Sequence, residues 1–254
     1  MLKRLNIREI LIICFLIFGI LSCASTDNQE LKSAEGIFNK AMALFNDEEY
    51  LEAKTTFDLI RLQYPASQYA DDAQYYIAEC HYRREEYIMS NYNFNMLRRY
   101  HPNSPFIKES FFKACMSNYY SAPQFDLDPK YTLDAIKSMS EFQAAYSSDS
   151  LAIVMDTYIQ ELRDRLAERE YETARLYKKL RSPASALIYY DVIINEYDDT
   201  KFFELAYLGK IEVLLEMKNW KQAKTTIEYF NILFKTSANL SKVKELANKI
   251  PQEN

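Results

Sequence analysis

The chain has 254 residues, of which 26% are charged and 48% hydrophobic, and its formal net charge is −5. An acidic chain argues against a nucleic-acid partner, because nucleic-acid-binding domains carry a basic patch. Three glycines and two histidines are too few for phosphate-binding loops or for a Cys/His metal cluster. Composition therefore favours an all-α protein that is not an enzyme and holds neither a metal ion nor a cofactor.

The first 22 residues have the pattern of an export signal. A cationic start is followed by an apolar run over residues 10–21, which is too short to span a bilayer. The run ends in Ile20-Leu21-Ser22-Cys23, which resembles the lipobox of bacterial lipoproteins. We expect cleavage before Cys23, a covalent lipid on Cys23, and a short tether over residues 23–30. The alternative is an ordinary secretory signal in which Cys23 is incidental.

A proline-closed pattern then recurs after 37 residues, which predicts stacked helical hairpins. The first hairpin is expected at residues 31–45 and 50–63, and the second at residues 71–84 and 87–100. Proline ends each second helix because it removes an amide donor and clashes with the preceding turn. The recurring residues are Tyr50, Ala53, Phe57 and Pro65, which return as Tyr87, Ser90, Phe94 and Pro102.

Three further hairpins follow at less regular intervals. Residues 121–130 carry two prolines and predict a loop inside the third hairpin, whereas the fourth gains a long charged helix over residues 149–179. The fifth hairpin begins its second helix at Trp220, and a capping helix is expected near Ser241. The small residues where the helices of each hairpin cross are Ala53, Ser90, Ala135, Ala186 and Ala223. This pattern resembles the tetratricopeptide repeat and predicts a helical-hairpin solenoid of about five repeats with a C-terminal capping helix.

Two thiols remain in the body of the chain, Cys80 and Cys115. They are able to pair in an oxidising compartment. Shifted back by 37 residues, however, Cys115 falls on Ala78, where a small residue is needed for close helix packing. Burial of both thiols as small hydrophobic side chains is therefore the favoured interpretation.

The order of anchor, repeats and insertion resembles the BamD family, the lipoprotein component of the outer-membrane β-barrel assembly machinery. The most specific stretch is Leu127-Asp128-Pro129-Lys130-Tyr131-Thr132-Leu133-Asp134-Ala135-Ile136, which is similar to that family's loop before a threonine-started helix. Tyr64-Pro65-Ala66-Ser67 and His101-Pro102-Asn103-Ser104 also resemble its tyrosine-proline turn, although His101 departs from it.

The resemblance implies a lipid-anchored adaptor at the periplasmic face of the outer membrane. Repeats one to three, over residues 31–148, would receive unfolded outer-membrane proteins. Residues 149–254, with repeats four and five and the cap, would dock on the periplasmic domains of the barrel subunit. The docking residues stay unassigned, because Asp198 and Lys235 replace the prolines that would fix the alignment.

The first helix of each hairpin is expected to line the concave face through its fifth, ninth and twelfth residues. Eight of the nine residues at these places in repeats one to three are aromatic or Met, and Glu79 is the exception. We expect them to form a client groove, with ordinary inter-helix core as the alternative. The groove residues are Phe38, Met42, Phe45, Tyr75, Tyr82, Phe112, Met116 and Tyr119. Nearby Arg83, Arg84, Arg98 and Arg99 are either solvated or placed to bind a carboxylate or an anionic lipid.

Three functions are thus compatible with the sequence. The favoured one is the assembly-machinery adaptor. The others are a different periplasmic repeat lipoprotein, serving an envelope or glycan-uptake complex, and a hydrolase on a helical solenoid. The last lacks a nucleophile elbow or a metal-ligand set.

Overall fold

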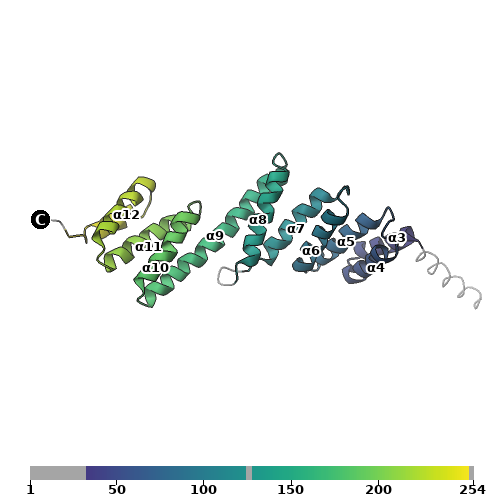
Figure 1. Ribbon diagram of the computed structural model, residues 1–254, viewed down its shortest axis with the longest axis horizontal. Helices are drawn as coiled ribbons and strands as arrows, with labels where there is room; N and C mark the ends of the chain where they lie inside the picture. Colours follow the sequence, from purple (N-terminus) through teal and green to yellow (C-terminus); the bar gives the residue numbers. More distant parts are fainter. Residues whose placement is uncertain (1–32, 124–127, 252–254) are drawn as a thin grey trace, which may run out of the picture. The chain divides into compact units, whose positions relative to one another are not determined.

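The computed structural model describes residues 33–123 and 128–251. Over these residues the chain forms eleven α-helices, α3 to α13, and no β-strand (Figure 1). The all-α, helical-hairpin fold expected from the sequence is therefore confirmed. The signal segment, Cys23 and the tether lie outside the described residues, as do residues 124–127 of the expected loop.

Most helices are of similar length, and only α9 is much longer. Their bounds are α3 Ala34–Asn46, α4 Tyr50–Gln63, α5 Ala70–Arg83, α6 Tyr87–Tyr100, α7 Ile107–Ser121, α8 Lys130–Ala145, α9 Ser150–Lys179, α10 Pro183–Glu196, α11 Phe202–Glu216, α12 Trp220–Leu233 and α13 Leu240–Ala247. α4 and α6 have the bounds that the sequence predicts, because an acidic break precedes each and a proline follows. The capping helix α13 begins one residue before the expected Ser241.

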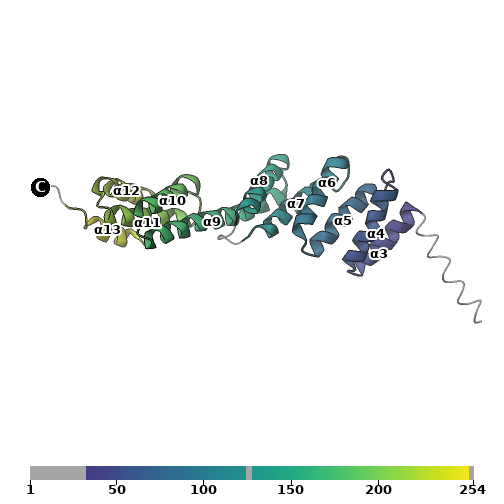
Figure 2. The ribbon, with the colours of Figure 1, turned by 60° about the horizontal axis from the view of Figure 1, so that its bottom comes forward.

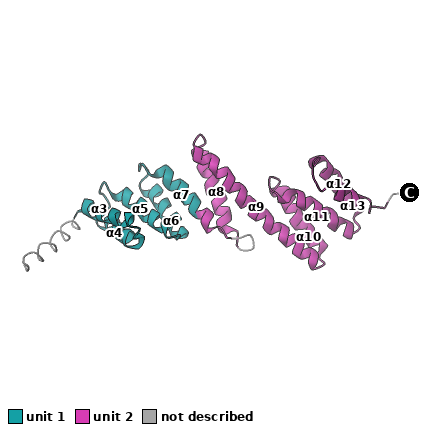
Figure 3. Ribbon diagram, turned by 180° about the vertical axis from the view of Figure 1, so that it is seen from behind, with its two compact units in different colours: residues 1–117 teal, residues 118–254 magenta. Residues whose placement is uncertain are grey.

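The chain divides into two compact units, residues 1–117 and residues 118–254 (Figure 3). The division falls inside α7. The Ser117 hydroxyl donates to Ser90 Oγ of α6, at 3.1 Å, whereas Asn118 Nδ2 donates to Ser138 Oγ of α8, at 3.3 Å. Consecutive residues of α7 thus belong to different packing neighbourhoods. The division between residues 148 and 149, which the sequence analysis drew by function, stays a prediction.

The same bend joins the two helices of four hairpins. Its central residue has a left-handed backbone although it is not glycine, with φ of 63°, 59°, 57° and 56° in turn, at Glu48, Glu85, Arg181 and Lys218. The residue after it donates its amide to the carbonyl five residues earlier, as Glu49 does to Leu44 and Glu86 does to His81, at 2.9 Å each. This bond satisfies a carbonyl at the end of the first helix and turns the chain into the second.

The crossing points of the hairpins are closely packed, as the sequence predicts. The five small residues are fully buried, and the larger residue one turn later is buried in each hairpin, as Phe57, Phe94 and Met139 illustrate. Cys80 and Cys115 are also fully buried among the packed helices. Their packing role is therefore confirmed.

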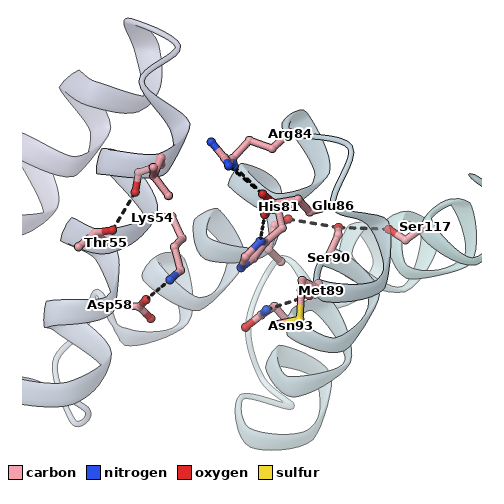
Figure 4. A network of polar contacts seen from close by, with 12 residues as sticks. Lys54, Thr55, Asp58, His81, Arg84, Glu86, Met89, Ser90, Asn93 and Ser117 are labelled. Atoms are coloured by element: carbon pink, nitrogen blue, oxygen red, sulfur yellow. Dashed lines mark hydrogen bonds and ion pairs between the residues drawn. The ribbon is translucent and has the colours of Figure 1, made fainter. Parts of the chain in front are cut away.

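Ser90 shows why one crossing residue is polar. Its hydroxyl donates to the Ala78 carbonyl of α5 at 3.2 Å and accepts from Ser117 at 3.1 Å (Figure 4). Because the serine is fully buried and its hydroxyl has both partners, it costs the core little. One small side chain thus joins α5, α6 and α7 in the first unit.

In the second unit, α9 packs along α10, and α10 to α13 follow as neighbours (Figure 2). A close approach between α10 and α11 depends on glycine. A Cβ added to Gly209 would lie 2.4 Å from Cζ of Tyr190, whose ring is buried. Gly209 is therefore required by packing, because no larger side chain fits against that ring.

Candidate functional site

The expected groove residues of α3 lie in an aromatic cluster rather than on an open face. Phe38 and Phe45 are half-buried, and each meets the Tyr76 ring of α5 edge to face, at centroid distances of 6.2 and 5.1 Å. Met42, between them on the helix, is half-buried against the same core cluster as the two rings. These three side chains hold α3 against α4 and α5, as residues of an ordinary inter-helix core do.

Tyr75 of α5 is almost completely buried, with 5% of its surface exposed. Its ring stacks on Phe106 at 4.2 Å between centroids, and its hydroxyl donates to Glu109 Oε1 of α7 at 2.6 Å. Burial and this hydrogen bond raise the pKa of Tyr75 well above its usual range. The phenol is therefore a fixed neutral donor that joins the first helices of two successive repeats.

Glu79 occupies the same stripe one turn later and is buried as well, with 3% of its surface exposed. Its carboxylate accepts from Arg83 Nε at 2.9 Å and also pairs with the Lys113 ammonium of α7. Lys113 Nζ in turn lies 5.7 Å from the Tyr75 ring centroid and 5.6 Å from that of Tyr82, within cation–π range. A buried ion pair between two tyrosine rings thus occupies the middle of the expected groove.

The third repeat contributes residues to both units. Phe112 is half-buried and Met116 is buried, and both belong to the first unit. Tyr119 belongs to the second unit, where its ring meets Tyr158 at 4.7 Å. Burial, together with the hydrogen bond that Tyr119 donates to Glu161, raises the pKa of Tyr119 to about 12. None of the eight expected groove residues has a freely exposed side chain.

Two residues of this cluster were missed by the sequence analysis, Glu109 and Lys113. Each lies 34 residues after its partner, so that Tyr75 meets Glu109 and Glu79 meets Lys113. The repeat spacing contains a signal that could have indicated these two partners. A carboxylate on a stripe of large apolar residues requires a buried cation nearby. The first helix of the following repeat supplies that cation, about one repeat length further along the chain.

The second unit has an open cleft of 570 Å³ on its own first-helix face. Lys178 of α9 reaches Glu212 and Glu216 of α11 at 2.8 and 3.2 Å, and Lys242 of α13 reaches Glu212 at 2.7 Å. Burial opposes ionisation of Glu212, but the hydrogen bonds from the two lysines outweigh it and lower its pKa. The apolar part of the lining is formed by Leu215, Trp220 and Leu246.

A smaller cleft of 290 Å³ shares Lys178, Glu212 and Lys242 with the first. Its other lining residues include Arg175 and Lys179, both cationic. The two clefts together present cations and carboxylates above an apolar floor. Such a lining suits an extended protein segment with side chains of both kinds.

A polar cluster at the α5–α6 bend has a structural role. Figure 4 shows His81 and Arg84 both directed at the Glu86 carboxylate, with His81 Nδ1 at 2.6 Å and Arg84 Nη2 at 2.8 Å. Hydrogen bonds from Arg84 and then His81 lower the pKa of Glu86. The contacts fix the bend after the left-handed Glu85.

The described ranges 33–123 and 128–251 contain neither a membrane-spanning helix nor a metal-binding cluster. Within them no helix is long and apolar enough to cross a membrane. The same ranges contain no group of three His, Cys, Asp or Glu side chains placed to hold a metal ion.

Most of the chain matches the model of one known protein family. A family model described as an outer membrane lipoprotein, YfiO, matches residues 30–227. The chain belongs to the YfiO family. YfiO is the BamD family, so the resemblance stated from the sequence is confirmed. The match contains α3 to α11 and the first half of α12, so the α13 wall of the large cleft lies beyond it.

Among solved structures, the YfiO-family chain is similar to one described as the TPR2AB-domain:pHSP90-complex of yeast Sti1. The identity is 13% and the TM-score 0.42, over 86% of this chain and 98% of that one. No curated protein matches the chain significantly. The fold assignment accordingly rests on the hairpins of the chain itself, and the family assignment on the YfiO match.

Proposed function

We propose that this YfiO-family chain is a lipid-anchored adaptor of the outer-membrane β-barrel assembly machinery. The observation that carries the proposal is the family match across nearly all of the hairpins, joined to an acyl-acceptor pattern at Cys23. A lipid on Cys23 would hold the hairpins at the periplasmic face of the outer membrane. The lipid is the one covalent group that the proposal requires.

Clients are proposed to bind the first unit. Its first helices carry the rings of Phe38, Phe45, Tyr75 and Tyr82, and a Lys113 ammonium lies beside the last two. The half-buried rings of Phe38, Phe45 and Tyr82 suit the aromatic side chains of an unfolded barrel strand, and Met42 allows the surface to adapt. This support comes from the chemistry of the side chains, and the identity of the client segment stays a prediction.

Docking on the periplasmic domains of the barrel subunit is proposed for the second unit. The 570 Å³ cleft there presents Lys178, Lys242, Glu212 and Glu216 around Trp220. Charged groups of both signs confer specificity on an interface, and an aromatic anchor confers affinity. We assign no catalytic step and no nucleic-acid partner to either unit.

The proposal is tested by capture from envelopes. The tagged full-length chain is expressed in its source cells, solubilised in detergent and purified, with Cys23→Ser as the matched control. We expect the barrel subunit to co-purify with the wild-type chain, and labelled palmitate to enter the wild type but not the variant. Recovery of only wall-associated or glycan-uptake proteins would instead support the alternative envelope scaffold.

A further inference from the structure

The second helix of the second hairpin, α6, has an exposed face of large apolar and aromatic side chains. Ile88 and Tyr100 are each 58% exposed, Tyr92 is 55% exposed and Met89 is 46% exposed. Arg99 is exposed beside Tyr100 at the end of the helix. α6 has no acidic residue anywhere along its length, in a chain whose net charge is −5.

The preceding repeat provides a comparison for this face. Shifted back by 37 residues onto α4, Met89 becomes Glu52 and Tyr92 becomes Thr55. The buried positions are filled alike in both helices, since Phe57 and Phe94 are both fully buried. At these two outward positions an acidic or polar residue of α4 is replaced by an apolar or aromatic one in α6, whereas Leu51 of α4 and Ile88 of α6 are apolar and exposed alike. Packing inside the unit therefore does not explain the exposed residues of α6.

The residue types on this face match one environment, the interface of a bilayer. Tyrosine rings are enriched at that depth because one end is apolar and the other polar. Arginine is attracted to anionic headgroups, and a carboxylate would be repelled by them. Arg98 is engaged within the fold instead, since its guanidinium lies 3.4 Å from the Phe111 ring centroid and its Nη1 donates to Asn95.

The anchor places this face within reach of a membrane. Cys23 precedes the first described residue, Ser33, by a tether that spans at most ~35 Å when fully extended. Both the start of α3 and the whole of α6 belong to the first unit. Because the anchor keeps the local lipid concentration high, a contact too weak to bind free protein is sufficient to orient the unit.

We propose that the exposed face of α6 contacts the surface of the membrane to which the chain is anchored, with Tyr92 and Tyr100 at the interface and Arg99 at anionic headgroups. The contact rests on the proposed function in one respect, the anchoring of Cys23. It would orient the first unit so that α6 faces the bilayer and the proposed client-binding first helices face away from it.

The test supplies the anchor chemically. The protein from Cys23 to Asn254, which contains every described helix, is coupled through the Cys23 thiol to a maleimide lipid. The carrier vesicles contain phosphatidylethanolamine, phosphatidylglycerol and a brominated lipid that quenches tryptophan. Cys80 and Cys115 are buried, and burial raises the pKa of Cys80 to about 12, so coupling is directed to Cys23. The only native tryptophan is removed by Trp220→Phe, and Tyr92→Trp provides the probe.

We expect the indole of Tyr92→Trp to shift to shorter wavelength and to be quenched several-fold more than that of Thr55→Trp, the matched position on α4. Adding Met89→Glu, which copies Glu52 of α4, should abolish most of the quenching while circular dichroism stays unchanged. Replacing phosphatidylglycerol by phosphatidylcholine should weaken the quenching.

Equal quenching at the two positions, or none at Tyr92→Trp, would overturn the proposal. Protection of the Tyr92→Trp indole by solubilised envelope proteins but not by lipid would also overturn it, in favour of a protein partner. Because the anchor is added chemically, these outcomes concern α6 alone. Failure of the proposed function appears separately, as a missing palmitate label or a missing barrel subunit.

Discussion

In both units an ion pair connects successive first helices, but the surroundings of that pair differ. In each, a lysine and a glutamate 34 residues apart bridge successive first helices, Glu79 with Lys113 in the first unit and Lys178 with Glu212 in the second. The first pair is enclosed by tyrosine rings, and Glu79 is almost fully buried. The second pair lines a cleft of 570 Å³.

On the proposed assignment, this difference is how one repeat architecture would support two binding roles. A pair that is buried and ring-covered mainly fixes the spacing of helices, and it leaves an aromatic edge around it. A pair that lines a cleft remains available to a charged partner, because its hydrogen-bonding groups face open space. The proposed clients of the first unit would meet the closed face, and the proposed barrel partner would meet the open face.

The largest effect is expected from Glu79→Ala. The variant leaves the Lys113 ammonium, whose side chain is 19% exposed, without its buried partner. Lys113 keeps only the exposed Glu109 carboxylate, at 3.6 Å. Because a partly buried charge that loses its buried partner is costly, we expect the first unit to lose about 3 kcal/mol of unfolding free energy. Urea unfolding followed by circular dichroism measures this loss. The matched control is Glu216→Ala in the open cleft, where the carboxylate is exposed and we expect less than about 1 kcal/mol. Equal losses would remove the distinction between a closed and an open pair.

A second prediction is specific to the other unit. Gly209→Ala places a Cβ against the buried Tyr190 ring, and we expect a loss of about 2 kcal/mol from overpacking. Trp220, the only tryptophan, lies in the second unit and its fluorescence follows the unfolding of that unit. The Trp220 transition should move to lower urea in Gly209→Ala and stay in place in Glu79→Ala. A shift of equal size in both variants would mean that the units unfold as one.

The smallest effect concerns acid stability of the second unit. Arg163 holds Asp199 through Nε and Nη2 at 2.6 Å each, and this hydrogen bonding lowers the pKa of Asp199. The stabilisation is therefore present above the ordinary aspartate pKa near 3.8 and is lost as the pH falls through the lowered value. Asp199 is 41% exposed in its side chain, so we expect Asp199→Asn to cost less than about 1 kcal/mol at pH 7.

Its measurement is the Trp220 transition between pH 6 and pH 3. The variant should lose less stability than the wild type over this range, because it has no carboxylate to protonate at that site. An identical acid dependence in both proteins would show that the ion pair contributes nothing.

The sequence predicted helix ends and helix crossings well where prolines or small residues mark them. Pro65 and Pro102 fixed the ends of α4 and α6, and the small residues fixed where helices cross. Exposure on the first helices was harder to predict, because it depends on how closely the next repeat covers them. Tyr75 and Met116 lie on the expected stripe, yet both are buried.

The charged partners were missed for a related reason. Lys113 has no special meaning in its own helix and acquires one only when the next repeat is placed against Glu79. The clefts of the second unit were also beyond sequence reasoning. They depend on α9, α11 and α13 together, and the turn residues Asp198 and Lys235 gave no fixed alignment there.

The central claim is that the first unit receives clients and the second unit docks on the assembly barrel. Photoreactive residues placed one at a time at Tyr82 of α5 and at Glu216 of α11, in living cells, test it most directly. We predict that the Tyr82 probe captures unfolded barrel precursors and that the Glu216 probe captures the periplasmic domains of the barrel subunit. Capture of the same partner at both positions, or of precursors only at Glu216, would contradict the division of roles.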